Sequence, residues 1–216
     1  LSHINFETSP KILEVACNMG TNMIELAKKY GCHIIGLDQN EQALEKAKEN
    51  INYYGVKNIE LRLSNGLEKL KTDEADTVII AGMGGELIID ILNRGKAFFD
   101  KKNTFILSPH TKTDEVRDYL IRKGFKILKE DMCIDEGKFY TVMEVRYTEN
   151  TVMYSEAELL YGKYLIENKH PVLLGFLKKE EEKYLSILSN TGLNEDRKKE
   201  LRYRLDIIKE TMNEMQ

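Results

Sequence analysis

Thr77-Val78-Ile79-Ile80-Ala81-Gly82-Met83-Gly84-Gly85 is the stretch that decides the fold. Its first four residues form an apolar, β-branched run, which predicts a buried parallel strand over 77–80. Three glycines follow within four positions, and glycine permits both positive φ angles and close backbone approach. A helix expected from about Glu86 adds unpaired N–H groups at the same edge. A strand that opens directly into glycines and a helix start predicts a ligand crevice at its carboxyl end.

The sequence on either side of this stretch alternates between strand and helix patterns. Further strands are expected over 11–17, 33–37, 59–63 and 104–107, and helices over 22–30, 40–54, 86–99 and 111–123. Asn40 is the expected N-cap of the second helix, and Thr111 with Asp114 has capping-box spacing for the fourth. The apolar faces predicted for the second and third helices are Leu44, Ala47, Ile51 and Tyr54, and Leu87, Ile88, Ile91 and Leu92.

Two strands over 125–132 and 139–145, joined by a tight turn over 135–138, predict an antiparallel hairpin after the alternating segment. Five β–α units followed by a hairpin predict an α/β fold, with a doubly wound sheet that ends in an antiparallel strand. We expect a first domain over residues 1–150.

Residues 151–216 change to long polar helices and are expected to form a second, α-helical domain. Pro171 suits the first position of one helix, and 190–194 is the expected turn before the last helix. The expected apolar stripes are Leu173, Leu177, Tyr184 and Leu188, then Leu201, Leu205, Ile208, Met212 and Met215. The second stripe has heptad spacing, which favours an antiparallel coiled-coil hairpin; helices packed flat on the first domain are the alternative.

Composition bounds the class of protein. The chain has 216 residues, 42% hydrophobic and 31% charged, and a net charge of −4, which weighs mildly against a polyanionic partner. No apolar run reaches the ~20 residues of a membrane helix, and no basic-then-apolar signal pattern opens the sequence. Three scattered cysteines and four scattered histidines give no zinc pattern. We therefore expect reduced thiols, a cytoplasmic location, no membrane and no metal; oligomeric state is not determined by the sequence.

Polar residues at three expected strand ends point to a nucleoside cofactor. Glu14-x-Ala16-x-Asn18-x-Gly20 has the spacing of the acidic-x-G-x-G-x-G loop of class I S-adenosylmethionine (SAM) methyltransferases, with one glycine retained. Asp38 is placed to accept both ribose hydroxyls, and the Asn65 amide to bind an adenine edge. The competing dinucleotide pattern, G-x-G-x-x-G, does not follow the first strand. Cofactor contacts are expected from Glu14, Asn18, Gly20, Asp38, Gln39, Asn65, Gly66, Ala81 and Gly82.

From Asn65 onward, the sequence resembles the bacterial tRNA (adenine-22-N1)-methyltransferases, the TrmK family. The matching segments are Asn65-Gly66-Leu67, 74–88 with its Ala-Gly-Met-Gly-Gly string, Leu107-Ser108-Pro109 and 136–140. The resemblance implies a Rossmann-like class I methyltransferase sheet with a C-terminal coiled-coil hairpin. Three segments of this sequence differ from the strings that are usual in the family: Glu14-Val15-Ala16-Cys17-Asn18, Asn65 and Ser108-Pro109-His110.

The resemblance implies SAM-dependent methylation of adenine N1 in tRNA. N1 has a free lone pair, so alignment within ~3–3.5 Å of the methyl group is the main requirement, and the base must be unpaired or flipped out. Substrate contacts are expected from Met83, Gly84, Gly85, Pro109 and His110, although His110 is equally consistent with a solvated loop residue; Cys17 is expected to be a core residue. No catalytic group is identified.

The resemblance also implies that the helical hairpin helps hold tRNA through basic residues: Lys178, Lys179, Lys183, Arg197, Lys198, Lys199, Arg202 and Arg204. Interleaved glutamates are equally consistent with an ordinary solvated face. Two other functions stay open: a SAM-dependent methyltransferase of another substrate, and a methyltransferase-like module that binds RNA or protein without catalysis.

Overall fold

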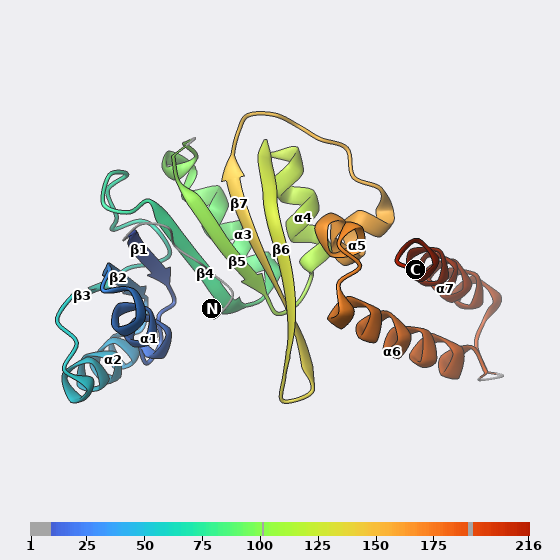
Figure 1. Ribbon diagram of the computed structural model, residues 1–216, viewed down its shortest axis with the longest axis horizontal. Helices are drawn as coiled ribbons and strands as arrows, with labels where there is room; N and C mark the ends of the chain where they lie inside the picture. Colours follow the sequence, from blue (N-terminus) through green and yellow to red (C-terminus); the bar gives the residue numbers. More distant parts are fainter. Residues whose placement is uncertain (1–9, 101, 190–191) are drawn as a thin grey trace. The chain divides into compact units, whose positions relative to one another are not determined.

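The computed structural model describes residues 10–100, 102–189 and 192–216 (Figure 1). This part of the chain divides into two compact units. The first runs to Leu128 and includes Val142–Val152; the second comprises Lys129–Thr141 and Met153–Gln216. The predicted turn at 190–194 lies partly outside the described residues.

A seven-stranded sheet has the order β3-β2-β1-β4-β5-β7-β6, and β1 to β5 lie wholly in the first unit. The strands of the sheet are β1 (Lys11–Val15), β2 (His33–Asp38), β3 (Ile59–Leu63), β4 (Thr77–Met83), β5 (Thr104–Pro109), β6 (Phe125–Asp135) and β7 (Lys138–Tyr147). β1 to β5 are parallel, and β7 runs antiparallel to β5. The predicted α/β class and the closing hairpin are confirmed. The strand order reverses between β1 and β4, where ligands bind in doubly wound sheets.

The helices of the first unit are α1 (Thr21–Tyr30), α2 (Glu41–Tyr54), α3 (Gly85–Arg94) and α4 (Thr113–Arg122). Because crossovers between parallel strands are right-handed, α1 and α2 cover one face of the sheet, and α3 and α4 cover the other. One apolar cluster joins α1 to the sheet. It consists of Ile12, Cys17, Met23, Leu26, Ala27, Cys32, Ile34, Ile79 and Ile106. Cys17 is therefore a core residue, as predicted.

Helix termini follow the expected local chemistry in α1 and α2. The Asn40 side chain accepts hydrogen bonds from the backbone N–H groups of Gln42 (2.9 Å) and Ala43, and Gly31 and Gly55 end the two helices in left-handed conformation. α4 differs from the prediction, because its N-cap is Lys112 at φ 55° and no capping box forms. The Thr111 carbonyl accepts the backbone N–H of Gly85 at 3.0 Å, so tertiary pairing of two loops overrides the capping box.

Several predicted boundaries and faces were wrong. Strand β4 continues three residues into the glycine stretch, with a bulge between Ala81 and Met83. α3 ends at Arg94 rather than near residue 99, because Gly95 interrupts it and a 3₁₀ turn follows. Residues 64–76 connect β3 to β4 without a helix in the described chain, so one of the five predicted β–α units is absent. Leu87 and Tyr54, predicted to be buried, are 46% and 52% exposed.

The second unit consists of the outer part of the β6–β7 hairpin, a π-helical turn at Glu158–Gly162, and the helices α5 (Lys163–Glu167), α6 (Pro171–Leu188) and α7 (Glu195–Glu214). Pro171 occupies the first turn of α6, as predicted. α6 and α7 pack against each other. The apolar core of the unit includes Leu173, Leu177, Ile208 and Met215 of the predicted stripes. Coiled-coil geometry within this helical pair stays a prediction.

No helix in the described ranges is long and apolar enough to cross a membrane.

Candidate cofactor and substrate site

Two adjoining pockets lie at the carboxyl ends of β1 to β4, and Ala16 lines both. We call the first the Glu14 pocket; its lining is Glu14, Ala16, Cys17, Asn18, Met19, Thr21, Asn22, Ala81 and Gly82. We call the second the Asp38 pocket; its lining is Val15, Ala16, Asp38, Gln39, Ser64, Asn65, Gly66, Met83, Leu87, Ile91 and Arg94. The polar residues predicted at three strand ends therefore converge at the point where the strand order reverses.

The loop between β1 and α1 adopts an unusual backbone. Ala16, Asn18 and Gly20 have φ angles of 56°, 47° and 77°. These are the alternate positions that glycines occupy in the class I methyltransferase loop. For a non-glycine residue, a left-handed conformation costs roughly 1–2 kcal/mol. The loop geometry is therefore kept at two positions where the glycine is missing.

Asp38 joins this loop to the end of β2. One carboxylate oxygen accepts the backbone N–H of Asn18 at 3.0 Å, and the other accepts that of Asn40 at 2.9 Å. The side chain is buried. Because each carboxylate oxygen has a second lone pair, Asp38 retains acceptor capacity on the side that lines the pocket.

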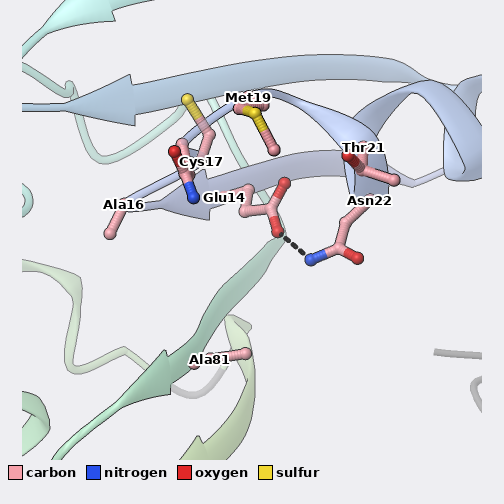
Figure 2. A pocket seen from close by; sticks show the side chains of 9 residues that line it. Glu14, Ala16, Cys17, Met19, Thr21, Asn22 and Ala81 are labelled. Atoms are coloured by element: carbon pink, nitrogen blue, oxygen red, sulfur yellow. Dashed lines mark hydrogen bonds between the residues drawn. The ribbon is translucent and has the colours of Figure 1, made fainter. Parts of the chain in front are cut away.

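Glu14 is 3% exposed, and its two oxygens differ. Oε1 accepts a hydrogen bond from Asn22 Nδ2 at 2.8 Å, whereas Oε2 has no partner in the described structure. Figure 2 shows this pair on one side of the pocket and Ala81 of β4 on the other. Burial raises the pKa of Glu14 to about 7, and the hydrogen bond from Asn22 opposes the rise. Buried, partly unpaired polar groups of this kind are typical of ligand sites.

Cys17 lines the Glu14 pocket, but its sulfur is a poor nucleophile. Burial raises the pKa of its thiol to about 12, and the carboxylates of Glu14 and Asp38 contribute to the rise. Since the thiolate is the reactive form, Cys17 has a packing role.

Two glycines of the glycine stretch, Gly82 and Gly85, have different structural roles. Gly82 has φ 78°, and nothing lies within 4 Å of the place where a Cβ would project. A Cβ on Gly85 would lie 2.6 Å from the Thr111 carbonyl oxygen and 2.8 Å from that of Lys112. One glycine thus provides the bend, and another permits the two loops to touch.

The predicted substrate residues lie in the two loops that follow β4 and β5, but they do not all line the same pocket. The backbone N–H of His110 donates to the Met83 carbonyl at 2.9 Å, which joins the loops after β4 and β5. Met83 lines the Asp38 pocket, whereas Gly84, Gly85, Pro109 and His110 line neither pocket. Pro109 is buried as the last residue of β5, and His110 is exposed. Gly20 is the N-cap of α1 and lines neither pocket, so its expected contact with the cofactor stays a prediction.

Two residues near the pockets, Asn22 and Leu87, were not predicted from the sequence to belong to the site. Asn22 lies on the first turn of α1, eight residues after Glu14, and a polar residue at a helix start gives no signal of a tertiary partner. Leu87 matched an apolar helix face, but its exposed side chain lines the Asp38 pocket. An apolar residue on the first turn of a helix that follows the glycines is the signal that would have identified it.

Comparison with known proteins decides the family. The family model described as tRNA (adenine(22)-N(1))-methyltransferase matches residues 22–214. The chain belongs to this family. A tRNA (adenine(22)-N(1))-methyltransferase of Bacillus subtilis strain 168 is 30% identical over 178 residues, which cover 77% of this chain and 75% of that protein.

Solved structures of this methyltransferase family share the fold. A Streptococcus pneumoniae protein superposes with a TM-score of 0.88 at 27% identity, covering 98% of this chain and 95% of that one. Its complex with SAM gives a TM-score of 0.85 and covers 95% and 93%. The B. subtilis tRNA methyltransferase TrmK gives 0.81 at 25% identity, with 95% and 93% covered. The predicted resemblance and the predicted Rossmann-like methyltransferase fold are confirmed.

Proposed function

We propose that this protein transfers the methyl group of SAM to N1 of adenine 22 in tRNA. Family membership supports the reaction, and the SAM-bound relative supports the cofactor. The observation that carries the proposal is the convergence of Glu14, Asp38, Asn65 and Gly82 at the reversal of strand order.

The residues present fit the cofactor. The unpartnered Oε2 of buried Glu14 suits its α-ammonium group, and Asp38 suits the ribose hydroxyls. The Asn65 amide and the apolar Leu87 and Met83 side chains suit its adenine ring. When bound, SAM supplies an electrophilic methyl group on a sulfonium.

The protein's own task is then to position the base. Adenine N1 needs no deprotonation before it attacks, so the reaction requires no thiolate base in the pocket. The thiol of Cys17, whose pKa is raised, is therefore not needed for the reaction. We propose that Met83, Gly84, Gly85 and His110 frame the target base, since the backbone bonds between the β4 and β5 loops hold these residues in fixed relation. Pro109 contributes by fixing the end of β5 rather than by touching the base.

The division of labour between the domains is also proposed. Residues 1–150 would bind SAM, and residues 151–216 would hold tRNA through exposed cations of α6 and α7, among them Lys178, Lys199 and Arg202. A tRNA substrate and the free cysteines Cys17, Cys32 and Cys133 support the cytoplasm as the location.

Methyl-labelled SAM with two unmodified transcripts tests this function. One transcript carries adenine and the other guanine at tRNA position 22. We expect label only in the adenine transcript, recovered after digestion as 1-methyladenosine. Label on protein or small molecules and not on tRNA would favour a methyltransferase of another substrate. SAM binding without transfer to any acceptor would favour a non-catalytic binding module.

A further inference from the structure

The Glu14 carboxyl is built into the sheet in a way that leaves one oxygen unsatisfied. It lies at the fourth position of β1, where it pairs in register with Gly36 of β2 and Ile79 of β4. Neither neighbour brings a polar side chain to it. Oε1 is held by Asn22 of α1, and the buried Oε2 has no partner in the described chain.

The described lining of the Glu14 pocket offers no positive charge that would keep this carboxyl ionised. Among the described residues that line the Glu14 pocket, none is Lys, Arg or His. The titratable neighbour is Cys17, and its thiol stays neutral because its pKa is raised to about 12. Asp38, at the end of β2, adds negative charge near that thiol. On α1, the contact is the neutral amide of Asn22.

Burial of an unpaired carboxylate without a counter-ion is costly, so the neutral acid is favoured until a cation arrives. The direction agrees with the pKa of about 7 for this group. An ordinary glutamate side chain has a pKa of 4.5 and is therefore ionised throughout the neutral pH range. A cation beside Oε2 would supply the missing opposite charge and reverse this preference.

We propose that a ligand ammonium group entering the Glu14 pocket displaces the proton of Glu14, so that cofactor binding releases a proton to solvent. This inference rests on the proposed function, because SAM and S-adenosylhomocysteine both carry an α-ammonium group. The step is balanced: Glu14 loses its O–H proton, the ligand ammonium keeps its three protons, and an ion pair forms. Cofactor affinity therefore rises with pH until Glu14 is ionised in the free protein.

Calorimetry of S-adenosylhomocysteine binding at about pH 6, in buffers of different ionisation enthalpy, counts the released protons. At this pH, the ligand α-ammonium is fully protonated, since α-amino groups titrate near 7.7–8.0. We expect release of most of one proton per site, because Glu14, with a pKa of about 7, is largely protonated at this pH. 5′-Methylthioadenosine, which lacks the amino-acid portion, is expected to bind with no release.

Two variants separate Glu14 from other groups. Glu14→Gln is expected to bind S-adenosylhomocysteine more weakly and without proton release, yet to bind 5′-methylthioadenosine as the wild type does, which shows that the fold is intact. Glu25→Gln, on an exposed position of α1, is expected to release the same number of protons as the wild type.

Wild-type binding of S-adenosylhomocysteine with no proton release would overturn the inference and leave the proposed function standing. Equal release by wild type and Glu14→Gln would overturn it as well, because another group would then be the source. Failure of both S-adenosylhomocysteine and SAM to bind would instead contradict the proposed function itself.

Discussion

The carboxylate of Asp38 holds the backbone N–H of Asn18 at 3.0 Å. This bond ties the loop after β1 to the end of β2, and Ala16 and Asn18 in that loop have positive φ angles. A tertiary hydrogen bond therefore supports this loop at positions where local glycines are missing.

Replacing Asp38 tests this bond. Asp38→Asn presents an amide NH₂ to one of the two backbone donors, at Asn18 or Asn40. A buried donor without an acceptor costs about 1–3 kcal/mol. We expect the free energy of unfolding to fall by that amount and SAM affinity to fall by about tenfold or more, measured by denaturation and calorimetry. Asp73→Asn, on an exposed loop residue, is the control, and equal behaviour of the two variants would contradict the assignment.

Relieving the loop tests the backbone strain. Ala16→Gly removes a side chain at φ 56° and is expected to raise the free energy of unfolding by about 1 kcal/mol. Ala47→Gly, the same change inside α2, is expected to lower it by about 1 kcal/mol or more. Urea denaturation measures both. Destabilisation by Ala16→Gly would show that the loop is not strained at this position.

Crowding the two loops tests their role in positioning the base. Gly85→Ala would place a Cβ 2.6 Å from the Thr111 carbonyl, where backbone has to move. We expect kcat for tRNA methylation to fall about tenfold or more, since misplacement by about 1 Å costs up to a hundredfold. SAM affinity should stay within about twofold, because Gly85 lines neither pocket.

The control for this variant is Gly175→Ala on α6, where nothing lies within 4 Å of the added Cβ. It is expected to methylate tRNA at the wild-type rate. An unchanged kcat in Gly85→Ala would remove the two loops from the proposed account of catalysis.

Stability should depend on pH through Glu14. Its pKa is about 7 in the folded protein against 4.5 for an ordinary glutamate, so the folded state binds the proton more tightly. This contribution to stability is present below about pH 4.5 and is lost as pH rises to about 7. Between those values, we expect the free energy of unfolding of the wild type to fall by about 3 kcal/mol relative to that of Glu14→Gln. Parallel pH curves for the two proteins would contradict a neutral Glu14.

Charge reversal tests the proposed tRNA-binding role of α7. Lys199 and Arg202 are exposed and form no salt bridge with the described residues. Lys199→Glu with Arg202→Glu is expected to raise KM for tRNA about fivefold or more and to reduce the salt dependence of binding, with SAM affinity unchanged. Lys46→Glu with Lys48→Glu on α2 makes the same change of charge in the first unit. If both pairs of substitutions raised KM for tRNA equally, the effect would be one of net charge, and the proposed role of α7 in tRNA binding would be contradicted.

The strand pattern and the polar strand ends were predictable because they are local. Periodicity identified β1 to β5, and parallel strands bring their carboxyl ends to one edge, so Asp38 and Asn65 could be placed together from sequence. The spacing Glu14-x-Ala16-x-Asn18-x-Gly20 also identified the loop after β1 as part of the candidate site.

The features that could not be predicted from the sequence depend on tertiary contacts. The bond from Gly85 to Thr111 set the start of α4, and no capping rule contains it. Leu87 is half exposed because its side of α3 faces a pocket, which helical periodicity does not distinguish from the core. The pairing of Glu14 with Asn22 joins a strand to a helix, and only folded geometry reveals it.

We propose that SAM lies across the carboxyl ends of β1 to β4. A crystal structure of this protein soaked with SAM would show its position directly. We expect the amino-acid portion against Glu14, the ribose at Asp38 and the adenine beside Asn65 and Leu87. Density for SAM elsewhere, or none at millimolar cofactor, would contradict it.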